Sequence, residues 1–99
     1  MIPVAWDKDA QDRHEAWAFQ IAMAFDLPTA RAYLLDIETA QIRIAQFSMS
    51  GVDFNSPGHP HLKRIITPSG YSVFYELDSV DRPTSAIIIS VIRGQEDQP

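Results

Sequence analysis

The sequence predicts a single α+β domain, in which an N-terminal strand and an antiparallel helical hairpin pack on a mainly antiparallel sheet of three to four strands. Two observations support this fold class. Apolar residues recur at helical spacing as far as residue 47 and then alternate from residue 62 onward. The chain has 99 residues, 45% of them hydrophobic, which is enough for one packed core and too short for two. We therefore expect one domain over residues 1–99.

Residues 2–6 predict a short strand that leads directly into a helix. Asp7 or Asp9 can accept hydrogen bonds from the first-turn N–H groups and also suits the positive end of the helix dipole. Pro28 disfavours helical geometry at the preceding residue and suits the first turn of a new helix, so the chain should break near residues 26–28. The apolar stripe of the first helix comprises Ala10, His14, Trp17, Ala18, Ile21, Ala22 and Phe25.

A second helix continues the 3.6-residue rhythm until residues 48–51. The short connection between the two helices predicts an antiparallel hairpin. Residues 50–61 hold two Gly, two Pro and two His, with Val52 and Phe54 as the apolar anchors, and predict a loop. The apolar stripe of the second helix comprises Ala30, Tyr33, Leu34, Ile37, Ala40, Ile44 and Phe47.

Three strands are predicted after the loop. Residues 62–67 form the first, a tight turn at Pro68-Ser69-Gly70 follows, and residues 71–77 form the second. Residues 85–93 form the third, which is apolar on both faces and should lie inside the sheet. The polar residues 94–99 predict a flexible tail.

Composition excludes several classes of protein. The chain has no cysteine, which excludes a disulfide framework, a thiolate metal site and a cysteine nucleophile. We find no signal peptide and no membrane span, so we expect a cytoplasmic location. The net charge of −5 repels a phosphate backbone unless the cations gather on one face. Residues 62–93 carry four positive and three negative side chains, so an anion-seeking surface should lie in this second half.

Local patterns along nearly the whole chain resemble one family. Val4-x-Trp6-x-x-x-Ala10 opens the chain, and Pro28-x-Ala30 opens the second helix. Arg64 precedes two isoleucines and an aromatic strand at residues 71–76, and residues 87–92 run into Arg93-Gly94-Gln95-Glu96-Asp97. In this order they resemble the RelE/ParE superfamily of toxins from bacterial type II toxin-antitoxin systems. The chain departs from the pattern in being acidic, in carrying Arg93 where the ParE-like branch often has His, and in a longer turn at residues 78–84.

The resemblance implies one of three functions. The ParE-like branch, which we prefer, implies a toxin that poisons DNA gyrase and is neutralised by a cognate antitoxin, with operator DNA bound only through that antitoxin. The RelE-like branch implies a metal-independent, ribosome-dependent mRNA endonuclease, so the ribosome with its mRNA is the alternative partner. A family member that is not toxic would retain only antitoxin binding. No cofactor, metal or membrane is implied.

Candidate site residues follow from these two toxin activities. An RNase needs a base, an acid and cations around one phosphate, and the conditional catalytic candidates are Lys63, Arg64, Tyr75 and Arg93. A gyrase poison needs no acid or base, and Arg64 and Arg93 are then the target-binding candidates. Adjacent residues point to opposite faces of a strand, so at most one of Lys63 and Arg64 can join Arg93. Alternatively, the two arginines pair with Glu76 or Asp97.

Other residues have simpler interpretations. His59 and His61 have a spacing that could hold a metal, but without cysteine or a clear carboxylate partner we favour solvated loop histidines. The aromatic pair Tyr71 and Tyr75 shares a strand face and should pack against the helices. The side chains expected in the core rather than in a partner groove are Trp17, Ile21 and Phe25.

Overall fold

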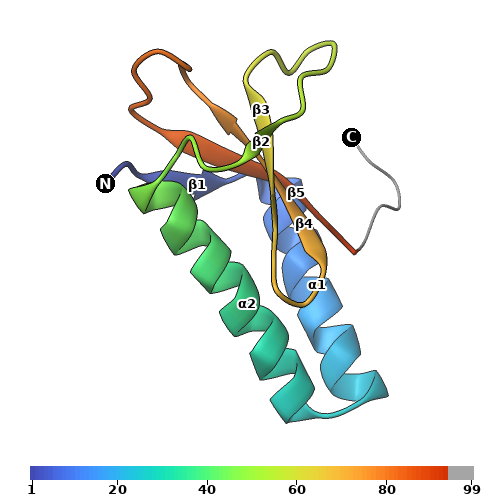
Figure 1. Cartoon of the computed structure of the whole chain (residues 1–99). Helices are drawn as coiled ribbons and strands as arrows, with labels where there is room; N and C mark the ends of the chain where they lie inside the picture. The colour runs from blue at the N-terminus through green and yellow to red at the C-terminus, as the bar shows by residue number, and fades with distance from the viewer. Residues whose placement is uncertain (94–99) are drawn as a thin grey trace.

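The computed structural model describes residues 1–93, and the predicted tail at 94–99 lies outside these described residues. A short strand is followed by two helices and four further strands (Figure 1). The elements are β1 (Val4–Trp6), α1 (Lys8–Ala24), α2 (Leu27–Gln46), β2 (Val52–Asp53), β3 (Leu62–Ile66), β4 (Tyr71–Leu77) and β5 (Ala86–Arg93).

The strands form one mixed sheet in the order β1-β5-β4-β3-β2. β1 runs parallel to β5, whereas the other neighbours are antiparallel. The predicted α+β class is confirmed, and β5 lies inside the sheet as expected. The described part of the sheet has five strands rather than three to four, because Val52 and Asp53 pair with Arg64 and Lys63 at the edge of β3.

Aspartates begin both helices of the hairpin. Asp7 caps α1 by accepting a 3.3 Å hydrogen bond from the backbone N–H of Ala10. Asp26 caps α2 by accepting a 2.8 Å bond from the N–H of Thr29, and Pro28 lies in the first turn as predicted. These bonds satisfy N–H groups that have no partner within the helix. The chain can therefore turn from β1 into α1, and from α1 into α2, within one or two residues.

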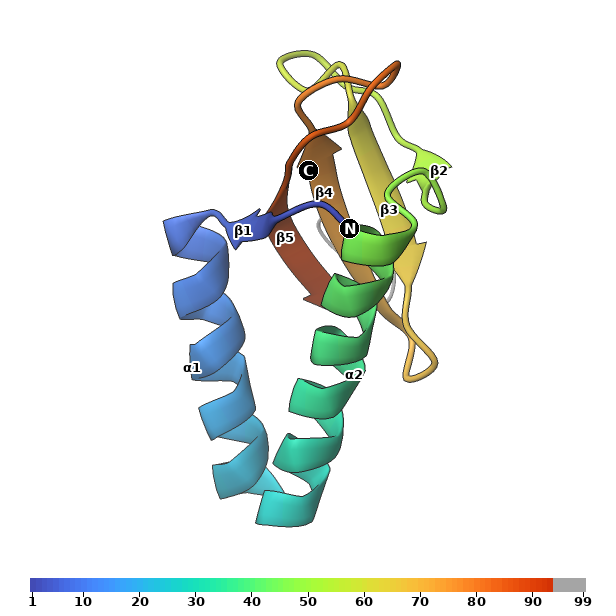
Figure 2. The same cartoon turned by 90° about the vertical axis from the view of Figure 1, so that its left-hand side faces the viewer.

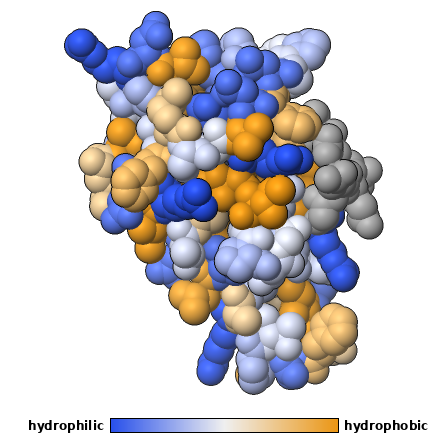
Figure 3. All heavy atoms as spheres, in the orientation of Figure 1, coloured by the Kyte–Doolittle hydropathy of each residue, from blue (hydrophilic) through white to orange (hydrophobic). Residues whose placement is uncertain are grey.

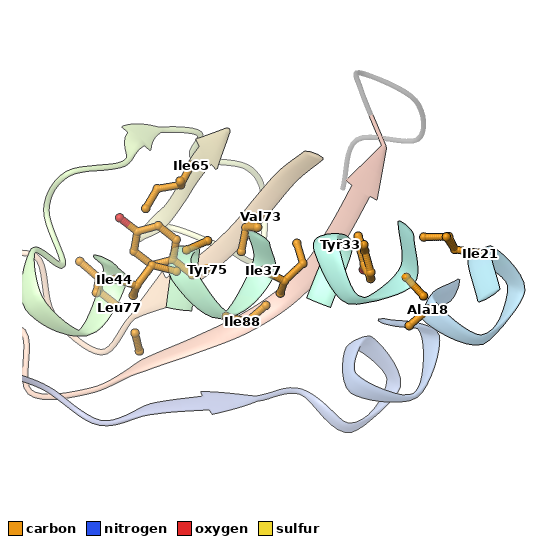
Figure 4. Close-up of a cluster of buried hydrophobic side chains, with 13 residues drawn as sticks. Ala18, Ile21, Tyr33, Ile37, Ile44, Ile65, Val73, Tyr75, Leu77 and Ile88 are labelled. Atoms are coloured by element: carbon orange, nitrogen blue, oxygen red, sulfur yellow. The ribbon is translucent and has the colours of Figure 1, made fainter. Parts of the chain in front are cut away.

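The core lies between the hairpin and one face of the sheet (Figure 4). It contains both predicted helical stripes in part, together with alternate residues of β3, β4 and β5. Three stripe positions were predicted wrongly, because Phe25 is 74%, Phe47 65% and Leu34 41% exposed. Phe25 and Phe47 each follow the last residue of a helix, where the backbone leaves helical geometry, whereas Leu34 lies beside the buried Tyr33 at the border of the stripe. The buried core residues are Ala18, Ile21, Ala30, Tyr33, Ile37, Ala40, Ile44, Ile65, Val73, Tyr75, Leu77, Ala86 and Ile88.

The opposite face of the sheet is partly covered by the loop after β2. Leu62 and Phe74 are completely buried there. Phe54 packs edge-on against Phe74, with 5.2 Å between the ring centroids. The hairpin, by contrast, extends beyond the end of the sheet, so its turn projects from the molecule (Figure 2).

Candidate functional site

Lys63 and Tyr75 lie on the helix-covered face of the sheet and are buried. Lys63 is 4% exposed, and its Nζ lies 2.6 Å from Asp53 Oδ1. The Tyr75 hydroxyl donates to the Ser48 carbonyl at 2.7 Å and accepts from the Gly51 N–H at 3.0 Å. Burial raises the pKa of Tyr75. Both side chains therefore hold the segment between α2 and β3 against the sheet.

Arg64 lies on the opposite face. Its guanidinium carbon is 5.3 Å from the centroid of the Phe54 ring, an arrangement that allows a cation–π interaction. The Arg64 Nε is buried and has no hydrogen-bond partner within residues 1–93. Glu76 on this face is paired with His59, at 3.5 Å between His59 Nδ1 and Glu76 Oε1, rather than with Arg64. His59 is thus a partner of a carboxylate and not simply a solvated loop histidine.

Arg93 ends β5 and is exposed to solvent. Its register partner is Tyr71, which packs against the core beneath the helices. Arg93 lines an open cleft of about 610 Å³ between α1 and β5. A pairing of Arg93 with Asp97 falls outside the described residues.

Aromatic side chains form one wall of this cleft. Trp17 Nε1 donates to the Tyr71 hydroxyl at 3.0 Å, and Tyr71 meets Tyr33 edge-on with centroids 4.8 Å apart. The Tyr33 hydroxyl lies 2.8 Å from His14 Nδ1, and His14 stacks on Trp6 at 4.7 Å. These contacts join β1, both helices and β4, so the aromatic side chains that line the cleft are held in position.

Burial also shifts the pKa of two groups in this aromatic cluster. It lowers the pKa of His14 below the usual 6.5, an effect that the nearby charge of Glu15 partly opposes. It raises the pKa of Tyr33. Both side chains are therefore held in their neutral forms at pH 7. Tyr71 and Tyr75 pack toward the helices as expected, while Trp17 packs on the core and also lines the cleft.

The four candidate residues do not meet in one place. Arg64 is the register partner of Phe74 on the face turned away from the helices, whereas Arg93 is the register partner of Tyr71 on the helix-covered face. Lys63 shares the face of Arg93 but is buried against Asp53. Within residues 1–93 no three His, Cys, Asp or Glu side chains form a group that could hold a metal ion. The described candidates thus form two separate cationic sites, one at Arg64 and one at Arg93.

The cleft also contains a residue that the sequence analysis did not single out. Arg13 projects from α1 into the lining of the cleft that contains Arg93. Its position three residues after Ala10 places it beside the apolar stripe, but only the packing of α1 against β5 shows that it lines the same cleft as Arg93. Charge counts along the chain gave no indication of this shared cleft.

The projecting end of the hairpin is apolar. Phe19, Met23, Phe25 and Leu27 are 67%, 73%, 74% and 61% exposed. On the face shown in Figure 3, orange apolar areas lie among blue and white polar ones. Clusters of exposed large apolar side chains commonly mark surfaces that bind other proteins. Among the described residues, neither helix is long and apolar enough to cross a membrane.

Comparisons with known proteins identify the fold. No protein-family model matches the sequence, and no curated protein is significantly similar to it. The structure is similar to a chain of the chromosomal ParDE TA system from P. aeruginosa, with a TM-score of 0.72 and 14% sequence identity. The match covers 96% of this chain and 98% of that chain. It confirms the predicted fold class, including its ParE-like arrangement of strand, helical hairpin and sheet.

Proposed function

We propose that the chain is the toxin of a type II toxin-antitoxin pair, that it inhibits growth by poisoning DNA gyrase, and that direct binding of a cognate antitoxin neutralises it. The likeness to a chain of a ParDE system over nearly the full length supports this assignment. Fold alone does not determine function, so the choice of target depends on the site.

We prefer gyrase over the ribosome as the target because the four candidate catalytic residues do not lie together. Metal-free RNA cleavage needs a base, an acid and cations around one phosphate. Tyr75 and Lys63 are buried and bonded to the chain, and Arg64 and Arg93 lie on opposite faces of the sheet. One phosphate cannot contact all four side chains. A poison that acts by binding needs only exposed surfaces, such as the cleft at Arg93 and the apolar end of the hairpin.

The charge of the chain supports a protein target as well. A net charge of −5 opposes direct binding to a phosphate backbone, so operator DNA would be bound through the antitoxin. Under this proposal the chain acts in the cytoplasm, where gyrase and the antitoxin are found.

One observation favours the RelE-like alternative. His59 and Glu76 form a pair on the same sheet face as Arg64, whose Nε has no partner among the described residues. An imidazole oriented by a carboxylate can act as a general base, and an arginine can stabilise a phosphorane. The ribosome with its mRNA would then be the target. In that case His59→Gln and Arg64→Ala should each relieve toxicity.

Controlled expression in a bacterial host distinguishes the alternatives. Growth arrest with plasmid DNA cleavage and induction of the DNA-damage response is the result expected of a gyrase poison. Rapid loss of translation with cleaved messages would instead indicate the ribosome, and normal growth would indicate a member that only binds its antitoxin.

Substitution of the exposed arginine tests the assigned surface. Arg93→Ala should relieve the growth arrest. Arg82→Ala should not, because Arg82 is also exposed but lies in the turn between β4 and β5 and does not line the cleft. Equal toxicity of the two variants, at equal protein levels, would remove Arg93 from the target-binding surface. Co-expression of the cognate antitoxin, which is to be sought in the neighbouring reading frame, should restore growth and yield a stable complex.

A further inference from the structure

The α2 helix carries apolar side chains on two opposite sides. Its buried stripe, which includes Ile37 and Ile44, packs in the core against the sheet. Leu35 and Ile42 each precede one of these residues by two positions, which places them about 200° around the helix. They are 63% and 47% exposed and lie on the side of α2 away from the sheet, which faces the viewer in Figure 2. Since a helix that is apolar on all sides is normally buried, this outer side calls for a partner.

The outer side of α2 has a pattern that is symmetric about its centre. Two leucines lie at the midpoint, an arginine and a glutamate lie three residues before and after them, and an apolar residue lies four residues farther out at each end. Spacings of three and four residues keep side chains on one side of a helix. The pattern therefore forms one continuous seam, about 22 Å long. The seam comprises Leu27, Arg31, Leu34, Leu35, Glu38 and Ile42.

The two charged residues of the seam have no ionic partner in their own chain. Arg31 and Glu38 are exposed, and neither forms an ion pair within residues 1–93. When a second copy of α2 runs antiparallel along the seam, two-fold symmetry places each Arg31 opposite Glu38 of the other copy. The same symmetry places apolar residues opposite apolar residues at the centre and at both ends. A second copy of the chain thus matches the seam in charge and in hydrophobicity.

The seam also borders a hollow between the two helices. This hollow has a volume of about 310 Å³, and its lining includes Leu34 and Glu38 of α2 and Glu15 of α1. At the centre of the antiparallel pair, Leu34 faces Leu35 of the second copy, whose side chain can enter the hollow. Paired helices commonly make contact in this way, with a side chain of one helix inserted between residues of the other.

We propose that the chain forms a symmetric homodimer, in which the outer sides of two α2 helices pack antiparallel about a two-fold axis at the middle of the seam. Each Arg31 pairs with Glu38 of the second copy, and the leucine and isoleucine at the ends of the seam pack on one another. A single pair of helices buries less than the roughly 1,600 Å² of a standard interface, so the dissociation constant lies in the micromolar range. None of the seam residues lines the cleft at Arg93, so the cleft is not part of this interface.

Analytical ultracentrifugation of the purified full-length protein tests the association. Between about 1 and 200 µM, the mean mass should rise from that of a monomer toward twice that value. Leu35→Asn should remain monomeric over this range. Because Leu35 is 63% exposed, this variant should keep its fold, which circular dichroism verifies. A parent protein that stays monomeric throughout would overturn the proposal.

Charge reversal tests the pairing across the two-fold axis. Arg31→Glu and Glu38→Arg should each raise the dissociation constant at least about tenfold, because two ion pairs become two repulsive contacts. An equimolar mixture of these two variants should dimerise again, since each reversed charge then faces an opposite charge on the other variant. Arg82→Glu changes the net charge equally but lies in the turn between β4 and β5, so it should leave the association unchanged. Equal effects of Arg31→Glu and Arg82→Glu, or a mixture that stays monomeric, would contradict the interface.

Cross-linking tests the antiparallel direction. The chain has no cysteine, so only introduced thiols can be joined. Under mild oxidation, a mixture of Leu27→Cys and Ile42→Cys should form the mixed disulfide in preference to either symmetric one, because a disulfide requires neighbouring Cα atoms and these two positions face each other across an antiparallel pair. Predominance of the symmetric disulfides would indicate parallel helices and refute the proposed arrangement.

The dimer and the toxicity can be tested separately. Mass is measured on purified protein and requires no toxicity, whereas growth arrest and plasmid cleavage require no dimer. A protein that dimerises through the seam but leaves growth normal would retain the homodimer and lose the gyrase assignment. A toxic protein that stays monomeric would give the reverse result.

Discussion

Removal of the Tyr75 hydroxyl should destabilise the fold by about 2 kcal/mol. This hydroxyl makes two hydrogen bonds, at 2.7 Å to the Ser48 carbonyl and at 3.0 Å from the Gly51 N–H. Each is worth about 1 kcal/mol net, and Tyr75→Phe leaves both backbone groups without this partner. For a domain of this size the melting temperature should fall by about 10 °C.

Equilibrium urea unfolding, followed by circular dichroism, measures this loss. Tyr33→Phe is the matched control, since within residues 1–93 the Tyr33 hydroxyl has one hydrogen-bond partner, His14 Nδ1 at 2.8 Å, and its loss should cost about 1 kcal/mol. The reasoning is refuted when Tyr75→Phe proves no more costly than Tyr33→Phe, because the second bond would then contribute nothing.

A double-mutant cycle tests the geometry independently. A Cβ at Gly51 would lie 2.5 Å from the Tyr75 hydroxyl oxygen, a distance that forces a shift. Gly51→Ala should therefore disrupt both bonds in the parent protein. In the Tyr75→Phe background that contact is absent, although a ring carbon at 2.9 Å still crowds the site. The double variant should be more stable than the sum of the single effects by about 1 kcal/mol, and strict additivity would contradict the contact.

Three further predictions concern stability. Burial lowers the pKa of His14, so the neutral imidazole contributes fully to the free energy of unfolding above pH 6.5, and this contribution is lost as the pH falls through the depressed pKa. In urea unfolding, the free energy of unfolding should therefore fall less between pH 7.5 and pH 5 for His14→Gln than for the parent. Hydrogen bonds from Thr84 and Ser85 lower the pKa of Asp78 from 3.8 to about 2, so Asp78→Asn should be less stable than the parent at pH 5, and the difference should disappear as the pH falls below about 2. Gly70 has φ +92°, so Gly70→Ala should cost about 1 kcal/mol in thermal unfolding and Gly70→Asn less.

The fold could be predicted from sequence where local patterns agree with tertiary structure. Pro28 marks the break between the helices, and the alternation in residues 71–77 gives β4 its observed bounds. β2 was missed because a two-residue strand has no pattern of its own. It forms because Val52 and Asp53 reach the edge of β3, an interaction that depends on Lys63 and on the turn held by Tyr75.

Periodicity predicts which residues share a face, but not how deeply each is buried. Lys63 and Arg64 lie on opposite faces, as adjacent strand residues must. Sequence could not show that Lys63 is the buried residue of the two. A buried lysine needs a partner for its charge, and that partner, Asp53 of β2, is brought close to Lys63 only by the fold. The same limit applies to Phe25, which has the phase of the buried stripe but follows the last helical turn of α1.

The cleft at Arg93 arises from a difference in strand length. β1 has three residues and β5 has eight, so the position beside β5 is filled for only part of its length. α1 then runs beside the remaining edge and adds Trp17 to the lining. No local pattern encodes a space between two elements, and in sequence Trp17 has the spacing of an ordinary core residue. A long strand paired with a very short one is the feature that sequence analysis could use to search for such clefts.

The distribution of charge limits what this surface can bind. Counting charges by halves of the sequence placed the anion-seeking surface in residues 62–93, but the structure divides those cations among Asp53, the Phe54 ring, an exposed turn and the cleft. The second arginine of the cleft, Arg13, comes from the first half of the chain. The lining also contains Asp7 and Asp9, so its formal charges balance and each arginine is a local cationic site rather than part of a track for a polyanion. One or two carboxylates on a protein segment match that site better than a nucleic acid, whose binding would require many more phosphate contacts to overcome the net charge of −5.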